Sequence, residues 1–182
     1  MRSRLLAFLV IVALFPLAAP AQGTKENPYK NAKVGDYVSY RMSTSAGGKE
    51  FNIDIKQIVT AKDDKEVSLK TTTSFNGKEL PGQTTKVDLT KPFDPASSVL
   101  QGKKGTFEKK DEGKEKVKVG DKAYDCTWIS GKVVAEFKGN KLESDVKFWV
   151  SKSVPLSGLV KMEMKSDFAN VRMELTGSGS EK

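Results

Sequence analysis

The side chains that most often carry enzyme chemistry are scarce in this 182-residue sequence. It contains no histidine, which removes the usual serine-hydrolase triad, a Cys–His nucleophile pair and the commonest transition-metal ligand. Its one cysteine, Cys126, cannot form an internal disulfide or hold a structural zinc ion alone. The acid pairs Asp63-Asp64 and Asp111-Glu112 lie beside lysines in predicted turns, and turn formation explains them. We therefore expect a protein that is not an enzyme and has no catalytic residue, metal or cofactor.

Binding chemistry is the better prospect, and it centres on residues 147–175, KFWVSKSVPLSGLVKMEMKSDFANVRMEL. Apolar and polar residues alternate here, as on strands that bury one face. The predicted inner-face residues are Phe148, Val150, Val160, Met162, Met164, Met173 and Leu175. Such a face either fills a core or lines a pocket for a lipid, an acyl chain or another hydrophobic small molecule, and methionine suits both roles. Core filling is the simpler interpretation of the methionines, and the pocket stays open.

Trp149 has the opposite orientation in this pattern. Alternation places it on the outer face, between Lys147 and Ser151. We expect it either to lie under a covering segment or to form an interaction surface for another protein of the cell envelope. Cys126 alternates with Tyr124 and Trp128, which predicts a buried cysteine on the inner face of a strand.

The strands that carry these residues must be joined by hairpin turns, which decide which side chains lie next to each other. Turn signals at Gly47-Gly48, Asn76-Gly77, Gly120-Asp121 and Gly139-Asn140 predict where the chain reverses. Pro81 predicts an edge strand, a bulge or a loop after the second turn. The predicted cross-strand pairs are Met42–Ile53, Tyr40–Ile55, Val117–Tyr124, Phe137–Leu142, Ala135–Ser144 and Val133–Val146.

Roughly nine or ten consecutive strands predict an all-β, mainly antiparallel fold. The expected architecture is a meander that curls into a half-barrel or barrel, with one short helix over residues 93–102. A two-sheet β-sandwich is the alternative. A parallel α/β fold is excluded, because the sequence offers no crossover helices.

The N-terminus predicts export. Residues 1–21 combine Arg2 and Arg4, an apolar run and the small residues Ala19-Pro20-Ala21, which is typical of a cleaved signal peptide. The apolar run is about 14 residues, shorter than the roughly 20 that span a bilayer, so no transmembrane span is expected after cleavage. Residues 22–176 would form a single β domain and residues 177–182, GSGSEK, a flexible tail. The location would be periplasmic or secreted.

The net charge of +8 comes largely from lysines scattered between acids, as in residues 109–122. Such a pattern is typical of a solvated surface. A nucleic-acid-binding protein would more often gather arginines and exposed aromatics on one face. We therefore expect no nucleic-acid partner.

Two stretches resemble a known group of proteins. They are DVKFWVSKSVPLSGLVKMEM, residues 145–164, and VKVGDKAYDCTWISGK, residues 117–132. Both resemble segments of uncharacterised exported bacterial β-rich proteins, which are distantly similar to the lipoprotein-carrier and lipoprotein-receptor half-barrels of the bacterial envelope. The resemblance implies an incomplete barrel with an apolar concave face, sometimes plugged by a short helix. This chain lacks the lipid-attachment cysteine of the anchored receptors.

Three functions follow as expectations. The first is an exported β half-barrel that binds an apolar or amphipathic ligand through the inner-face residues. The second is a structural or protein-interaction module of the cell envelope that uses the outer face around Trp149. The third is an enzyme that works through carboxylates or Ser–Lys pairs.

Overall fold

The computed structural model describes residues 27–92, 105–137 and 140–181. The predicted signal peptide over residues 1–21 and the predicted short helix over residues 93–102 lie outside these ranges. Within them, no helix has the length and apolar character needed to cross a lipid bilayer.

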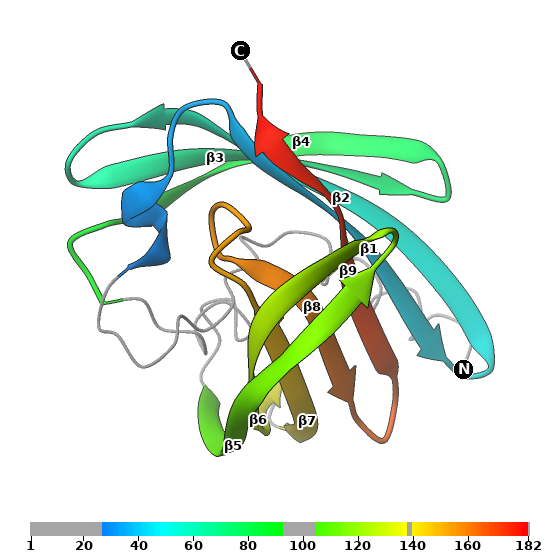
Figure 1. The fold of residues 1–182 in the computed structure, drawn as a ribbon. Coiled ribbons are helices and arrows are strands. Elements are labelled where there is room, and N and C mark those ends of the chain that lie inside the picture. The colour runs from blue at the N-terminus through cyan, green and yellow to red at the C-terminus, as the bar shows by residue number, and fades with distance from the viewer. Residues whose placement is uncertain (1–26, 93–104, 138–139, 182) are drawn as a thin grey trace.

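The described chain forms one antiparallel sheet of nine strands (Figure 1). A 3-10 helix, η1 (Pro28–Asn31), precedes them, and the strands are β1 (Asp36–Ala46), β2 (Lys49–Lys62), β3 (Glu66–Phe75), β4 (Lys78–Asp88), β5 (Gly105–Val119), β6 (Lys122–Phe137), β7 (Asn140–Val150), β8 (Leu159–Lys165) and β9 (Asn170–Ser180). Their order is β4-β3-β2-β1-β9-β8-β7-β6-β5, so β1 and β9 meet in the middle and β4 and β5 are open edges. The predicted antiparallel meander half-barrel is confirmed, and the two-sheet sandwich is excluded.

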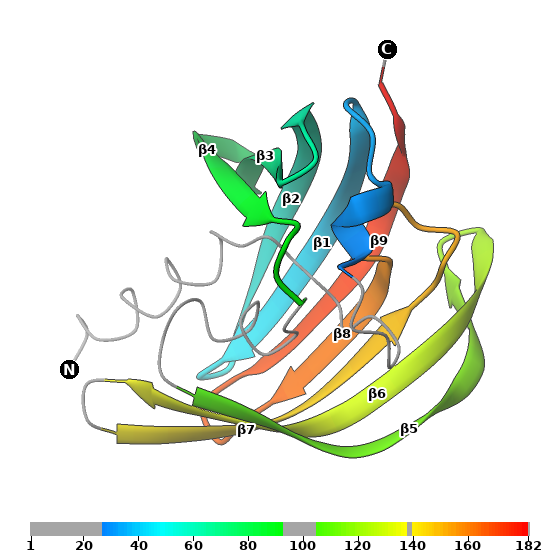
Figure 2. The same cartoon turned by 90° about the vertical axis from the view of Figure 1, so that its left-hand side faces the viewer.

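The sheet curls around the side that collects its apolar residues (Figure 2). Every second residue of a strand points to the same side, so alternation in the sequence sorts the two faces. We call the side that carries Met42, Phe148 and Met162 the concave face. The opposite side, which carries Arg41 and Trp149, is the convex face.

Several predicted hairpins are confirmed by the pairing. The confirmed pairs are Met42–Ile53, Tyr40–Ile55 and Val117–Tyr124. Pro81 lies in the edge strand β4, where the register with β3 shifts between Thr71 and Thr73. An edge strand with a bulge tolerates proline because its missing N–H breaks no interior ladder.

The predicted register of the β6–β7 hairpin is wrong by two residues. The observed pairs are Ala135–Leu142 and Val133–Ser144, in place of Ala135–Ser144, Val133–Val146 and Phe137–Leu142. The reason is that β6 ends at Phe137 and β7 begins at Asn140, so the chain reverses one residue earlier than predicted. The predicted turn at Asp111-Glu112 is also wrong, because both residues lie within β5 beside a register shift.

A flexible tail was predicted for residues 177–182, and for residues 177–180 this prediction is wrong. Residues 177–180 continue β9 and pair with β1, after a bulge that shifts the register between Ser39 and Tyr40. The backbone pairing with β1 orders these residues, and at Gly179 the Tyr37 ring lies close enough that an added Cβ would be 3.2 Å from it. The Glu181 N–H then donates to the Gly35 carbonyl at 2.8 Å.

Candidate functional site

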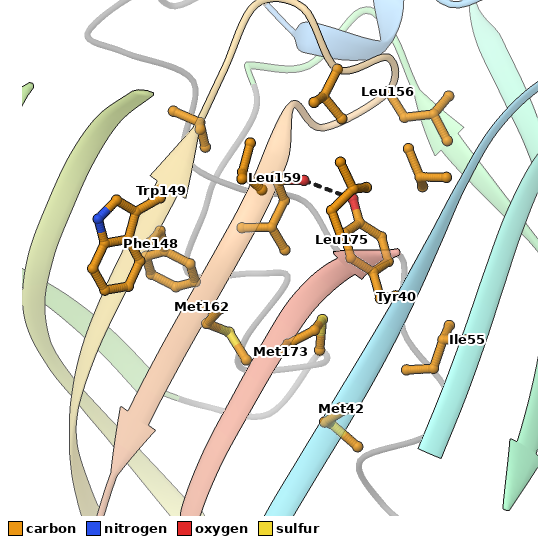
Figure 3. Close-up of a cluster of buried hydrophobic side chains, with 14 of the residues drawn as sticks. Tyr40, Met42, Ile55, Phe148, Trp149, Leu156, Leu159, Met162, Met173 and Leu175 are labelled. Carbon is orange, nitrogen blue, oxygen red and sulfur yellow. Dashed lines mark hydrogen bonds between the residues drawn. The ribbon is translucent and has the colours of Figure 1, made fainter. Parts of the chain in front are cut away.

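A row of apolar side chains crosses the middle of the concave face (Figure 3). Successive cross-strand partners from β2 to β6 are Ile53, Met42, Met173, Met162, Phe148 and Ile129. We call this set the methionine row, because three methionines from β1, β9 and β8 lie side by side at its centre. Methionine side chains are flexible and polarizable, so such a row can repack around different apolar shapes.

The structure brings the seven predicted ligand-binding residues together on β7, β8 and β9, all on the concave face. Six of them are buried and Met164 is half-buried. They join one hydrophobic cluster with residues of β1, β2 and β3. At the centre of the concave face these side chains therefore have little contact with solvent.

An opening lies next to this cluster, at the end of β7. A cavity of about 650 Å³ is lined by Pro28, Asn31, Ala32, Asp36, Val150 and residues 151–158. Its walls thus come from η1 and from the loop that joins β7 to β8. We call it the end cavity. Val150 belongs both to its lining and to the hydrophobic cluster, so the end cavity adjoins the apolar concave face.

The β7–β8 loop holds an unusual backbone conformation at Leu156. Its φ is 60°, a left-handed value that costs an L-residue about 1–2 kcal/mol. Leu156 lies in a turn in which the Gly158 N–H donates to the Pro155 carbonyl at 3.3 Å. Its side chain is buried, and burial of a leucine contributes about 1.5–3 kcal/mol. Packing of Leu156 against the core therefore offsets the backbone strain.

The other wall, η1, is fixed by an N-terminal cap. The Asn27 side-chain oxygen accepts from the Tyr29 N–H at 3.1 Å, and its amide nitrogen donates to the Asp88 carbonyl at 3.1 Å. Lys62 donates to the Ala32 carbonyl at 2.8 Å from β2. Tyr29 is fully buried, and this burial raises its pKa far above the ordinary value, so the phenol stays protonated. These contacts hold the wall in place against the sheet.

The polar groups that line the end cavity are the side chains of Asn31, Asp36 and Lys152 and three serine hydroxyls. The Ser151 and Ser153 hydroxyl oxygens lie 2.9 Å apart, and Ser157 is buried beside them. The Tyr40 hydroxyl donates to the Leu159 carbonyl at 3.3 Å on the adjoining core side, and burial raises its pKa (Figure 3). A cavity with an apolar wall and a few polar groups suits binding of an amphipathic ligand. In the described ranges, no three acidic or cysteine side chains are grouped to hold a metal ion.

Trp149 lies on the convex face as predicted, and its side chain is only 4% exposed. Its indole Nε1 donates to Glu115 Oε1 at 2.7 Å. The ammonium groups of Lys147 and Lys161 lie 4.5 and 4.8 Å from its ring centroid. Since its neighbours cover the indole, Trp149 does not offer a free apolar surface, and this counts against the predicted interaction site.

Trp128 and Cys126 complete this part of the convex face. Trp128 pairs with Trp149 and lies over Gly113, where an added Cβ would come within 2.8 Å of the Trp128 ring. Cys126 is buried as expected, but the prediction that it lies on the inner face is wrong. It lies two residues from Trp128 on β6 and pairs with Glu115, so it points to the convex side with both. Burial, followed by the nearby Glu115 carboxylate, raises the pKa of the Cys126 thiol to about 11.

The end cavity has no signal in the sequence pattern. Residues 153–158, SVPLSG, carry the proline and glycine typical of a bend between strands, and no periodicity indicates η1. The Asn27-Pro28 step is a readable helix start, since asparagine caps and proline fits the first helical position. No local pattern, however, indicates that η1 meets a loop more than a hundred residues later in the chain.

A scan against protein-family models finds no match to this chain, and a search of curated proteins finds none either. Solved structures do resemble it. A putative exported protein with YmcC-like fold from Bacteroides fragilis NCTC 9343 aligns with a TM-score of 0.53 and 12% identity, over 85% of this chain and 98% of that chain. A putative lipoprotein from Parabacteroides distasonis ATCC 8503 aligns with a TM-score of 0.54 and 11% identity, over the same shares of 85% and 98%. At these identities the likeness concerns the fold alone, and the chain is similar in fold to these two proteins.

Proposed function

We propose that this chain is an exported, non-enzymatic protein of the cell envelope that holds a lipid, an acyl chain or a similar amphipathic ligand. The end cavity carries the proposal, because it opens beside the apolar concave face. Its volume of about 650 Å³ falls in the range of roughly 300–1,000 Å³ usual for small-ligand sites. The export step rests on the signal-peptide pattern of residues 1–21.

The path of the ligand follows from the lining. Val150, Val154 and Leu156 supply apolar wall in the end cavity, and Val150 leads to the hydrophobic cluster of the concave face. The methionine row lies further along that face and can repack more readily than a row of branched residues. An acyl chain would therefore enter through the end cavity and extend along the face as the methionines shift. The fold of the two structural neighbours, one described as exported and one as a lipoprotein, agrees with a place in the envelope.

A matched pair of substitutions tests the proposal. Val154 is buried in the end cavity, whereas Val34 is 58% exposed on the segment between η1 and β1. Val154→Trp should fill the cavity, and Val34→Trp adds the same side chain in solvent. Binding of an uncharged naphthylamine dye to the mature chain, residues 22–182, would be followed by its fluorescence. We expect Val154→Trp to weaken binding by about tenfold or more, and Val34→Trp by less than about twofold.

Thermal unfolding of both variants must accompany the binding curves, so that loss of fold is not taken for loss of the site. Native mass spectrometry of the chain purified from a bacterial envelope provides a second readout, in which a bound lipid adds its mass. Absence of dye binding by the wild-type chain, or equal binding by a folded Val154→Trp variant, would contradict the proposal.

A further inference from the structure

Three lysines line up on one side of the edge strand β5. The three are Lys114, Lys116 and Lys118, which lie two positions apart along the strand, so all of them point to the side of the sheet that carries Phe148. Neighbours on such a row lie about 7 Å apart, inside the screening length of about 8 Å at physiological salt. Their mutual repulsion makes the row a place where an anion would be stabilised.

Two of these lysines border a second cavity. Lys114 and Lys116 line a hollow of about 840 Å³ together with Thr127, Lys152 and other residues of β6 and the β7–β8 loop. We call it the basic cavity. Residues 150–153 line both it and the end cavity, so the two hollows adjoin along this segment. An apolar site and a basic site thus lie on either side of one short stretch of chain.

The acids near the basic cavity are already engaged. Asp125 lies 3.6 Å from Lys116 across the β5–β6 pair. Glu115 also borders the cavity, but it points to the convex face, where it accepts from Trp149 and lies 3.6 Å from Lys147. Lys114 and Lys152 are exposed at the cavity wall. Because Asp125 is paired with Lys116 and Glu115 points to the convex face, the positive balance of the cavity comes from Lys114 and Lys152.

We propose that the ligand is an anionic amphiphile, whose carboxylate or phosphate head group is held by Lys114, Lys116 and Lys152 while its chain occupies the end cavity. This inference rests on the proposed function and adds the chemistry of the head group. The positive charge of the lysines favours an anionic head group. Residues 150–153 line both cavities, so a head group in the basic cavity would lie next to the apolar wall of the end cavity. Lys114, Lys116 and Lys152 border one hollow together, and this shared site favours a single captured molecule over docking on a membrane.

Two detergents with the same chain isolate the effect of the head group. Dodecanoate and dodecyltrimethylammonium carry opposite charges on similar chains, and each is used below its micelle concentration to displace the uncharged naphthylamine dye. The wild-type chain should release the dye at about tenfold lower dodecanoate than dodecyltrimethylammonium at low salt. The triple variant Lys114→Gln, Lys116→Gln, Lys152→Gln should reduce this preference to about twofold or less. The matched control Lys49→Gln, Lys70→Gln, Lys78→Gln removes the same charge from exposed sites on β2, β3 and β4 and should keep the preference.

The outcomes separate the two proposals. Equal displacement by both detergents from a chain that binds the dye would overturn the head-group assignment and leave the proposed function standing. A wild-type chain that binds no dye would overturn both. Lysine-dependent sedimentation with phosphatidylglycerol vesicles, without any preference for monomeric dodecanoate, would make the lysine row a membrane-docking surface and would also overturn the assignment.

Discussion

Two neighbouring rows of side chains run across the same strands on opposite faces of the sheet. The methionine row of the concave face reads Ile53, Met42, Met173, Met162, Phe148 and Ile129. The convex row, one residue away on each strand, reads Asp54, Arg41, Glu174, Lys161, Trp149, Trp128 and Gly113. The first row is buried throughout, whereas the second alternates in charge from Asp54 to Lys161 and continues with the tryptophan pair and Gly113.

The difference locates where the fold gains its stability. Burial of apolar surface contributes about 25 cal/mol per Å², and the methionine row loses nearly all its contact with water. The convex ion pairs, such as Arg41–Asp54 at 2.8 Å, are exposed and therefore contribute little. Trp149 is the exception on the convex face, because its polar atom is paired and its ring is covered. Substitutions matched across the two rows test this contrast.

The largest expected effect comes from Phe148→Ala in the methionine row. Phe148 is buried and packs edge-on against Phe107, with ring centroids 6.3 Å apart. Removing the ring should lower the free energy of unfolding by about 3–5 kcal/mol, because it leaves a cavity in the core. Arg41→Ala in the convex row should leave the urea midpoint nearly unchanged, since its guanidinium is exposed. Similar urea midpoints for the two variants would contradict the contrast.

One substitution, glycine to alanine, can be made on both faces. At Gly131 a Cβ would approach the Glu108 carbonyl oxygen to 2.4 Å and the Phe107 ring to 2.5 Å. At Gly113 its nearest neighbour would be the Trp128 ring, at 2.8 Å, which is a half-exposed side chain and not backbone. Gly131→Ala should therefore cost about 1–3 kcal/mol or more, and Gly113→Ala clearly less. Urea unfolding curves measure the free energy of unfolding of both variants. A larger loss of stability for Gly113→Ala would mean that the convex face, and not the concave face, is the more tightly packed of the two.

These two faces were predictable from the sequence for a simple reason. Alternation with period two assigns each side chain to a face, and glycine turns such as Gly47-Gly48 fix the register of short hairpins. The β6–β7 register escaped prediction because a shift of two residues keeps Val133 and Val146 on the concave face. The hydrophobic pattern therefore fits both registers, and only the turn decides between them.

The end of β9 and the end cavity escaped for different reasons. Glycine and serine in residues 177–180 are typical of linkers, yet backbone pairing with β1 orders the strand, with the Tyr37 ring close to Gly179. The end cavity depends on contact between η1 and the β7–β8 loop, which no local pattern encodes. Leu156 added to the difficulty, because leucine seldom adopts a left-handed backbone.

The tryptophan pair gives the convex face its own test. Trp149→Phe keeps most of the buried ring and removes the indole donor to Glu115. Hydrogen bonds to charged groups are among the stronger ones, so the loss should be about 1–2 kcal/mol. A double-mutant cycle with Glu115→Ala, which removes the acceptor, should show coupling of about 1 kcal/mol. Coupling near zero would mean that the covered position of Trp149, and not its hydrogen bond, accounts for its stability.

The smallest effect concerns Cys126, the buried thiol of the convex face. Only the thiolate reacts with iodoacetamide, so burial and a pKa raised to about 11 should make native labelling at pH 8 far slower than labelling in urea. The raised pKa also means that folding favours the neutral thiol. Its contribution to stability is complete below pH 9.0, the ordinary pKa, and is lost as the pH rises towards 11. The Cys126→Ser variant should lack this decline in urea titrations between pH 9 and 11. Rapid labelling of the folded protein would instead show that the Cys126 thiol is in contact with solvent. The convex face beside Trp128 would then be as exposed to solvent as the charged residues of the convex row, such as Arg41.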